Sequence, residues 1–311
     1  MANNRNRFAF FEGKFVPIED AKISIMTHAL NYGTGCFEGI RAYWNEEENE
    51  LFIFRPIDHF QRFLESTRLL RMELPQTHEE AVKTLIELIH KENLHEDIYV
   101  RPLAFYSDEI IGVRLHNVTP IMTISVLPFG RYLDNEEGAH VMFSSWRRID
   151  DNMIPARGKI CGAYVNSALA KSDANLAGFD EAIMLNQDGH IAEGSAENVF
   201  ILRKGKIVTP PVTDNILEGI TRNTMMTLLR DELGMEVVER SIDKSEVYLA
   251  DEAFMVATGA QLVAITRIDY RKIGTGIMGP VTQKLRNLYF NVVRGRVPKY
   301  RQWCHPVYGK K

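Results

Sequence analysis

The chain has 311 residues, more than a typical single domain, so two domains are the better expectation. Hydrophobic residues make up 45% and charged residues 25%, as in ordinary soluble globular proteins. The net charge of -4 provides no basic face for nucleic acid or for an anionic membrane. No apolar run approaches the ~20 residues that span a bilayer. We therefore expect neither nucleic acid nor a membrane as a partner.

The cysteines and histidines predict no disulfide framework and no metal site. Cys36, Cys161 and Cys304 lack any CxxC spacing, and this sparse, odd count favours a reducing compartment. The first residues lack an apolar segment followed by a cleavage site, so we expect a cytoplasmic protein. Cys161 lies two residues from Lys159 but has no visible base, which favours a small buried filler over a nucleophile. His28 has no second ligand at helical or hairpin spacing and is interpreted as structural.

The first part of the chain combines hairpins with two helices. The predicted elements are a hairpin around Glu12-Gly13, a hairpin across residues 45–50, a helix capped by Asp58, a helix opened by the capping box Thr77/Glu80, and strands at 98–105 and 121–127. Hairpins without alternating crossovers predict an α+β fold.

Residues 128–138 break the periodicity and read as an interdomain connection between domains at 1–127 and 139–311. Ligand sites favour domain interfaces, so Tyr132 is a candidate pocket residue, or else a tyrosine that only packs over the seam. The second part is predicted to hold helices at 163–177, 221–233 and 280–293 and strands at 139–146, 182–185, 197–202, 207–209, 236–242, 253–257 and 262–268.

Lys159 and Glu193 are the residues that point to chemistry. Lys159 falls in an irregular segment, where a desolvated amine would have a lowered pKa and could attack a carbonyl. Glu193 follows the hairpin signal at 186–189, so a strand should carry it back beside the lysine segment. A lysine for a Schiff base and an acid for a pyridinium nitrogen are the minimum set of a pyridoxal phosphate enzyme. Taken alone, such a pair is usually solvated surface.

The segment Gly219-Ile220-Thr221 lies at a predicted helix start. Free backbone N–H groups and the positive end of the helix dipole favour a phosphate there, and Thr221 can add a hydroxyl. The alternative is that Thr221 serves only as the N-cap.

Two further patterns exclude other enzyme classes. The run from Gly274 to Gly279 matches GxGxxG, but it leads straight into Pro280 without room for a βαβ unit, so a glycine turn is the better interpretation. The chain has no HExxH, GxSxG or GKS/T motif, which argues against the common hydrolases and P-loop proteins.

Four segments of the chain carry a long and specific pattern. The longest reads Glu193-Gly-Ser-Ala-Glu-Asn198-Val-Phe200, then Ile207-Val-Thr209-Pro-Pro, then Leu217-Glu-Gly219-Ile220-Thr221-Arg222. The others are His28-Ala-Leu-Asn-Tyr32-Gly-Thr-Gly-Cys-Phe37-Glu-Gly-Ile-Arg41, Tyr99-Val-Arg101-Pro and Ser145-Trp146-Arg147-Arg148. Together these segments resemble the class IV (fold type IV) aminotransferases, and most of all the branched-chain amino acid aminotransferases. The resemblance covers the chain from Phe8 to about Phe290.

The resemblance implies a two-domain fold like that of D-amino acid aminotransferase. The smaller N-terminal α/β domain and the larger C-terminal domain would hold pyridoxal 5'-phosphate at their interface, in a homodimer or a higher homo-oligomer. The implied reaction is ping-pong transamination between L-leucine, L-isoleucine or L-valine and 2-oxoglutarate, through a Lys159 aldimine. Lys159 would then act as the base that moves the α-proton.

The resemblance also implies the cofactor-binding residues. Glu193 would keep the ring nitrogen protonated, and Tyr164 would donate a hydrogen bond to the phenolate oxygen. The implied phosphate contacts are Arg62, Gly219, Ile220, Thr221 and Thr258.

The substrate pocket is implied in the same way. Aromatic residues would wall an apolar pocket for branched side chains: Tyr32, Phe37, Tyr132 and Tyr164. Tyr99 and Arg101 are two apart on one strand, so they share a face and can meet the distal carboxylate of glutamate. The alternative for Arg101 is an ion pair with a nearby acid on a half-buried strand.

One departure affects specificity. The family often reads Gly-Thr-Ala-Ala-Glu where this chain has Ala257-Thr258-Gly259-Ala260-Gln261. Amides of Gly259 and Ala260 would bind the substrate α-carboxylate, so this change can loosen that clamp, and Arg114 in the loop Gly112-Val-Arg114-Leu-His offers another carboxylate site. A broad-specificity, D-amino acid or (R)-amine transaminase therefore stays open as the alternative.

Other hypotheses are separable by simple observations. A 4-amino-4-deoxychorismate lyase would cleave its substrate, and the Tyr99–Arg101 pattern does not suggest it. A non-catalytic binding protein on the same fold would lack the cofactor absorption band. A nicotinamide-dependent oxidoreductase would show a cofactor-dependent absorbance change.

Overall fold

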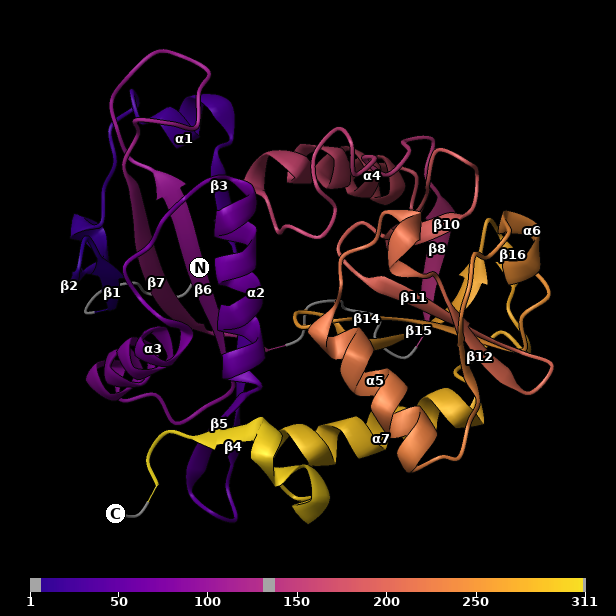
Figure 1. Cartoon of the computed structure of the whole chain (residues 1–311). Helices are drawn as coiled ribbons and strands as arrows, with labels where there is room; N and C mark the ends of the chain where they lie inside the picture. Colours follow the sequence, from indigo (N-terminus) through magenta and orange to yellow (C-terminus); the bar gives the residue numbers. More distant parts are fainter. Residues whose placement is uncertain (1–6, 131–137, 310–311) are drawn as a thin grey trace. The chain divides into compact units, whose positions relative to one another are not determined.

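The computed structural model describes residues 7–130 and 138–309 (Figure 1). The chain divides into two compact units. Of the described residues, the first contains 7–130, 158–162 and 291–309, and the second contains 138–157 and 163–290. The predicted second domain was 139–311, whereas residues 158–162 and 291–309 pack with the first unit.

The first unit contains an eight-stranded antiparallel sheet in the order β17-β5-β4-β6-β7-β1-β2, with β3 paired to β6. Its strands are β1 (Phe8–Phe11), β2 (Lys14–Pro17), β3 (Gly35–Phe37), β4 (Ile40–Asn45), β5 (Glu50–Phe54), β6 (Ile98–Tyr106), β7 (Pro120–Pro128) and β17 (Cys304–Pro306). Alternate residues of β7, Met122, Ile124 and Val126, are buried, as expected for a strand with one face on the core. The predicted hairpins β1–β2 and β4–β5 are confirmed.

Three α-helices belong to this unit: α1 (His28–Tyr32), α2 (Pro56–Leu69) and α3 (His78–Glu92). Helix α3 packs against β1 and β7, and α2 packs against β3 (Figure 1). The capping box of Thr77 and Glu80 is confirmed, since each side chain accepts from the backbone N–H of the other. The predicted cap of α2 was wrong, because the N-cap is Arg55 and Asp58 lies inside the first turn, where it accepts from the Arg55 guanidinium.

The second unit contains a nine-stranded mixed sheet in the order β10-β9-β8-β15-β14-β11-β12-β13, with β16 paired to β15. Its strands are β8 (Ala139–Phe143), β9 (Glu181–Leu185), β10 (Ile191–Gly194), β11 (Asn198–Arg203), β12 (Lys206–Thr209), β13 (Val237–Glu239), β14 (Glu252–Ala257), β15 (Gln261–Ile268) and β16 (Arg271–Lys272). Strand β8 runs parallel to β9 and β15, and β12 runs parallel to β13. The predicted hairpin after Leu185 is confirmed as β9–β10.

Four α-helices belong wholly or mainly to the second unit: α4 (Tyr164–Leu176), α5 (Ile220–Asp231), α6 (Lys244–Val247) and α7 (Pro280–Val293). The bounds of α7 equal the predicted ones. Helix α4 packs against β9 and α5 against β14. The Glu252 carboxylate accepts from the first-turn N–H groups of Val281 and Thr282 and from the Thr282 hydroxyl, which satisfies donors that a helix start leaves open. The mixed helix and sheet content confirms the predicted α+β class.

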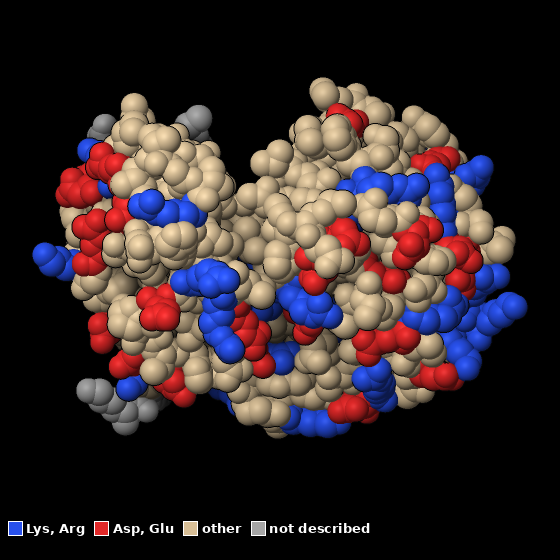
Figure 2. All heavy atoms as spheres, turned by 45° about the horizontal axis from the view of Figure 1, so that its top comes forward, with Lys and Arg blue, Asp and Glu red and all other residues tan. Residues whose placement is uncertain are grey.

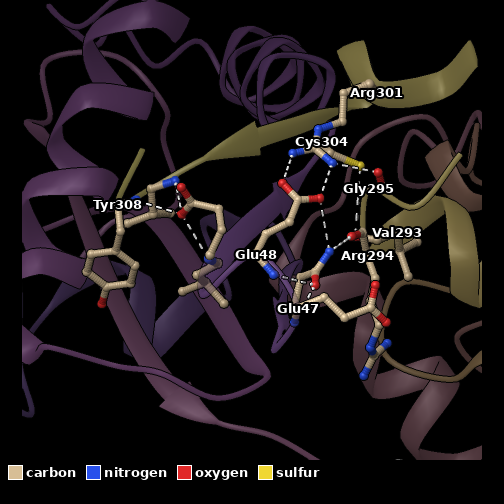
Figure 3. A network of polar contacts seen from close by, with 12 residues as sticks. Glu47, Glu48, Val293, Arg294, Gly295, Arg301, Cys304 and Tyr308 are labelled. Carbon is tan, nitrogen blue, oxygen red and sulfur yellow. Dashed lines mark hydrogen bonds and ion pairs between the residues drawn. The ribbon is translucent and has the colours of Figure 1, made fainter. Parts of the chain in front are cut away.

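A polar network fastens the C-terminal segment to the first unit (Figure 3). Arg301 pairs with Glu48 and donates to the carbonyl oxygen of Gly295 over 2.6 Å. The Glu50 carboxylate is buried and accepts from the backbone N–H groups of Val307 at 3.0 Å and Tyr308 at 2.7 Å. These contacts, together with the β17–β5 ladder, explain why the segment after residue 290 does not stay with the second unit.

Both charge signs are interspersed over the face of the molecule shown in Figure 2, without one continuous basic area. Within the described residues, no helix combines the length and apolar character of a membrane span.

Replacing Glu50 with alanine should lower the free energy of unfolding by about 1–3 kcal/mol, because the N–H groups of Val307 and Tyr308 lose their buried acceptor. Urea unfolding measures this loss, and amide hydrogen exchange at the two residues should accelerate. The control is Glu48→Ala, which removes a half-exposed ion pair and should cost only ~0–1 kcal/mol. Equal losses in the two variants would contradict the special role of Glu50.

Candidate active site

Lys159 lies in the predicted irregular segment and is held by the first unit. Its backbone N–H donates to the Ser66 hydroxyl at 3.1 Å, and its carbonyl oxygen accepts from the Phe37 N–H at 3.0 Å. The next residue forms an isolated antiparallel bridge, Cys36 to Ile160. These contacts fix the lysine backbone against β3 and α2, and leave its side chain only partly buried.

Two cations share the ring of Phe37. The Lys159 Nζ atom lies 4.9 Å from the ring centroid, and the Arg101 guanidinium carbon lies 4.4 Å from it. Arg101 also donates to the Tyr99 hydroxyl at 2.9 Å, so the predicted common face of Tyr99 and Arg101 is confirmed. A Cβ atom on Gly39 would stand 2.1 Å from that hydroxyl, so glycine is needed there for the close approach. Of the predicted substrate residues, Phe37 contacts both Lys159 and Arg101, and Tyr99 contacts Arg101.

Arg62, on α2, forms a buried ion pair with Glu38. Its Nε and Nη2 atoms donate to the two oxygens of Glu38 at 2.6 and 2.9 Å, and His59 Nδ1 lies 2.9 Å from the same carboxylate. Burial alone would raise the pKa of Glu38, but Arg62 and His59 outweigh it and hold that pKa well below its usual range. The pair orients the guanidinium that was predicted to contact a phosphate.

Glu193 lies on β10 in the second unit and is buried with three donors on its two oxygens. Arg148 Nε donates to Oε1 at 2.8 Å. Asn198 Nδ2 and the N–H of Leu217 donate to Oε2 at 3.1 and 3.0 Å. A carboxylate has about four acceptor positions, so these bonds leave capacity for one further donor. The predicted strand placement of Glu193 is confirmed.

The alternative interpretation of Thr221, as the N-cap of α5, was wrong. Gly219, not Thr221, is the N-cap, and Thr221 lies buried in the first turn. A Cβ atom on Gly219 would stand 2.0 Å from the Asn198 amide oxygen, so a side chain does not fit there. Asn198 thus joins the helix start to Glu193 through its amide.

Thr258, Gly259 and Ala260 form the turn between β14 and β15, where Ala257 pairs with Gln261. Gln261 has a φ of 62°, the left-handed region that suits glycine or asparagine better. Asn198 pairs with Val256, two residues before Thr258. The second unit therefore gathers Glu193, the α5 start and this turn at one end of strands β11 and β14.

Tyr32 belongs to a different set of contacts in the first unit. Its hydroxyl accepts from the N–H of Gly112 at 3.0 Å, and its ring packs on His28. His28 is buried between Thr34 Oγ1 and the carbonyl oxygen of Gly112, which agrees with a structural histidine. Tyr164 begins α4 and is half-buried. Tyr132 lies outside the described residues.

The remaining sequence patterns have structural explanations. The glycines from Gly274 to Gly279 connect β16 to α7 and form no βαβ unit. Burial raises the pKa of the Cys161 thiol, although Arg101 and Lys159 lower it in part, which fits a filler better than a nucleophile. The described ranges contain no group of three or more His, Cys, Asp or Glu residues that could hold a metal ion.

Four residues that hold the site in place were not predicted from the sequence: Glu38, His59, Arg148 and Asn198. Three of these lie inside the segments that carry the family resemblance, and His59 lies three residues before Arg62. A buried charged group needs hydrogen-bonded partners of opposite charge. This rule alone could have indicated that Glu193 and Arg62 would each have a counter-charge.

Comparison with known proteins decides the family. Residues 35–268 match the amino-transferase class IV family. The chain belongs to this family. A curated relative of this aminotransferase, the probable branched-chain-amino-acid aminotransferase of Aquifex aeolicus, is 52% identical over 97% of both chains. The expected class IV resemblance is thereby confirmed.

Solved structures agree with the fold. The branched-chain amino acid aminotransferase of Thermobaculum terrenum in its PLP-form has a TM-score of 0.94 and 38% identity, over 99% of this chain and 100% of that one. The T.th. branched-chain amino acid aminotransferase complexed with N-(5'-phosphopyridoxyl)-L-glutamate has a TM-score of 0.91 and 39% identity, over 97% of this chain and 98% of that one. The predicted class IV aminotransferase fold is therefore confirmed.

Proposed function

We propose that this protein is a pyridoxal 5'-phosphate-dependent enzyme that transfers the amino group of L-leucine, L-isoleucine or L-valine to 2-oxoglutarate. The curated relative is named for branched-chain amino acids, and two solved relatives hold the cofactor or its conjugate with glutamate. The observation that carries the proposal is the convergence of Lys159 and Arg101 on the ring of Phe37. The Lys159 amine and the Arg101 guanidinium, which can bind a carboxylate, thus lie against the same aromatic ring.

The residues fit the cofactor by their chemistry. Lys159 offers a primary amine that can hold an aldehyde covalently. Glu193 is buried with spare acceptor capacity, as a ring N–H requires, and a dianionic phosphate suits the α5 start with Gly219, Ile220 and Thr221. Arg62 and Thr258 are the further proposed phosphate contacts, and Tyr164 the proposed donor to the phenolate oxygen.

The reaction then follows from what the side chains do. When bound, the cofactor supplies an electron sink for the carbanion at the substrate α-carbon. Lys159 accepts the α-proton from one atom and returns it to another, so one amine serves as base and then as acid. Glu193, ionised beside Arg148, keeps the ring nitrogen protonated. Gly259 and Ala260 are the proposed amide donors to the substrate α-carboxylate.

The proposed reaction needs one pocket that accepts both an apolar branched side chain and the carboxylate of glutamate, and Arg101 with its aromatic neighbours suits both. The Arg101 Nε atom is buried and has no hydrogen-bond partner within the described residues. Such an atom suits the distal carboxylate of glutamate, whereas Phe37 and Tyr99 give leucine an apolar surface. Tyr32 and Tyr132 remain proposed members of the pocket.

Lys159→Ala should lower the rate of transamination by at least ~10²-fold, because the residue that carries the proton is removed. The protein should stay folded. In the parent protein, an absorption band of the bound cofactor should disappear with L-leucine and return with 2-oxoglutarate. The control is Lys206→Ala, which alters a half-exposed ion pair with Glu236 and should leave the rate unchanged. Substantial residual activity in Lys159→Ala would contradict the proposal.

Arg101→Ala should lower kcat/KM for glutamate and 2-oxoglutarate by about 10- to 100-fold, since a charge-assisted hydrogen bond to the distal carboxylate is lost. The value for L-leucine should change only a few-fold. Steady-state kinetics on both substrates measure the difference. Equal losses for both would mean that Arg101 does not bind this carboxylate.

A second candidate function is a broad-specificity, D-amino acid or (R)-amine transaminase. The turn Thr258–Gly259–Ala260 before Gln261 favours it, because this turn departs from the usual family sequence at the proposed α-carboxylate clamp. Arg114 in the loop before β7 is the other candidate carboxylate site. D-alanine and (R)-1-phenylethylamine, tested in the same spectral experiment, separate the two functions.

We also propose a homodimer or a larger homo-oligomer in the cytoplasm. The three cysteines are free, as a reducing compartment would keep them. An apolar patch covers the segment before and in α1 and the loop from 107 to 119. Its exposed members include Ile25 at 82% and Val113 at 84%. His28 and Tyr32 bind Gly112 of this loop, so the two segments that carry these side chains are neighbours, and exposed apolar patches mark interfaces.

The double variant Ile25→Asp/Val113→Asp should dissociate the oligomer into monomers, because two charges would have to be buried in the interface. Size-exclusion chromatography with light scattering measures the mass. As a control, Leu176→Asp changes a side chain that is 89% exposed at the end of α4 in the second unit, and should leave the mass unaltered. An unchanged mass in the double variant would place the interface elsewhere.

A further inference from the structure

Three buried glutamates lie around the turn between β10 and β11, and within the described residues two cations form ion pairs with them. Glu181 pairs with Lys171 at 2.6 Å, and Glu193 pairs with Arg148 at 2.8 Å. Glu197 is 1% exposed and has no ion pair among the contacts of the described residues. One carboxyl group in this cluster is therefore left without a counter-charge.

The backbone forces Glu197 into this position. The N–H of Gly194 donates to the carbonyl oxygen of Glu197 at 2.6 Å and closes a tight turn. The carboxyl group folds back over Gly194, where a Cβ atom would stand 2.7 Å from its Oε2. Oε2 accepts from the N–H of Ala196 at 3.0 Å, whereas Oε1 is buried without a partner within the described ranges.

The energetics favour a neutral acid at this place. An ionised carboxylate without a cation loses its hydration on burial, and the group then takes up a proton instead. Burial raises the pKa of Glu197 to about 8, and the charges of Glu181 and Glu193 contribute to this rise, against the lowering effects of the Ala196 N–H and Lys171. The groups that face Glu197 thus come from α4, β9 and β10.

We propose that Glu197 is a positioning residue, a buried carboxylic acid that keeps its proton while Glu193 beside it is ionised. This inference rests on the proposed function, in which Glu193 holds the cofactor ring nitrogen. With Glu197 neutral, each of the two ionised carboxylates is matched by one cation, so that Glu193 alone sets the proton affinity of the ring. Ionisation of Glu197 would add an unmatched negative charge to the site and bind the ring proton more tightly.

The sign of the pH effect follows from linkage. The carboxyl pKa is raised from 4.5 to about 8 on folding, so between these pH values the folded state holds a proton that the unfolded state has released. Stability from this group is complete below the unfolded pKa and declines as the pH rises toward about 8. Glutamine copies the protonated acid and does not titrate, so it avoids this decline.

The test compares thermal unfolding of the full-length protein with that of Glu197→Gln across a pH series from 5 to 9, with the cofactor removed and with it added. The variant should differ least from the parent at pH 5 and become increasingly more stable than it toward pH 8. Parallel curves, or a variant that is less stable at pH 8, would overturn the proposal.

Two control variants sharpen the result. Glu252→Gln changes another buried glutamate of the same unit, whose carboxylate accepts three hydrogen bonds at the start of α7, and should destabilise at pH 8. Glu181→Gln removes the like charge that faces Glu197 and frees Lys171, so the titration of Glu197 should move to lower pH. An unmoved titration in Glu181→Gln would contradict the cluster.

Infrared spectroscopy of the parent protein provides a measurement that does not depend on how a variant folds. A C=O stretching band of a protonated carboxyl should be present at pH 6 and lost by pH 9, and its absence at pH 6 would refute the proposal. In the loaded enzyme, the cofactor absorption of the parent should change with pH near 8, and that change should vanish in Glu197→Gln. If the protein binds no cofactor, the proposed function fails, while unfolding and infrared data still decide the protonation of Glu197.

Discussion

The carboxylate of Glu193 is buried in the second unit, and its charge depends on the donors that surround it. Arg148 from the segment after β8, Asn198 from the start of β11 and the N–H of Leu217 all reach it. Removing water from an ion costs several kcal/mol unless such partners replace it. The turn after β10, the start of β11 and the approach to α5 are therefore organised around one charge.

The same constraint acts in the first unit. Glu38 has no exposed surface, and Arg62 and His59 supply its partners. Because the carboxylate holds the guanidinium from one side, Arg62 has a fixed direction instead of the many rotamers of a free arginine. The proposed phosphate contact is thus prepared by an ion pair, in the way that the proposed ring contact is prepared by Arg148.

Local sequence signals predicted most helices and strands, but they did not predict contacts between residues that are far apart in the sequence. The hairpin before Glu193, the capping box of α3 and the bounds of α7 follow from residues within a few positions of each other. The pairing of Glu193 with Arg148 joins residues 45 apart, and that of Glu50 with Tyr308 joins residues 258 apart. Hydrophobic periodicity does not reveal such contacts, so the predicted boundary placed residues 291–309 in the second domain, whereas they belong to the first unit. The resemblance named Lys159 and Glu193, but not the residues that hold them.

Glu38 and Glu197 show that residue type and burial alone do not predict the pKa of a side chain. Both are almost fully buried, and each stands beside a glycine in space or in sequence. Burial would raise the pKa of both, yet that of Glu38 falls well below its usual range and that of Glu197 rises to about 8. The difference is the cation, since Arg62 touches Glu38 directly, whereas Glu197 faces two carboxylates and a lysine already paired with Glu181. The protonation state of a buried glutamate in this aminotransferase is therefore decided by partners from other elements. For this reason two glutamates with similar burial have opposite protonation states.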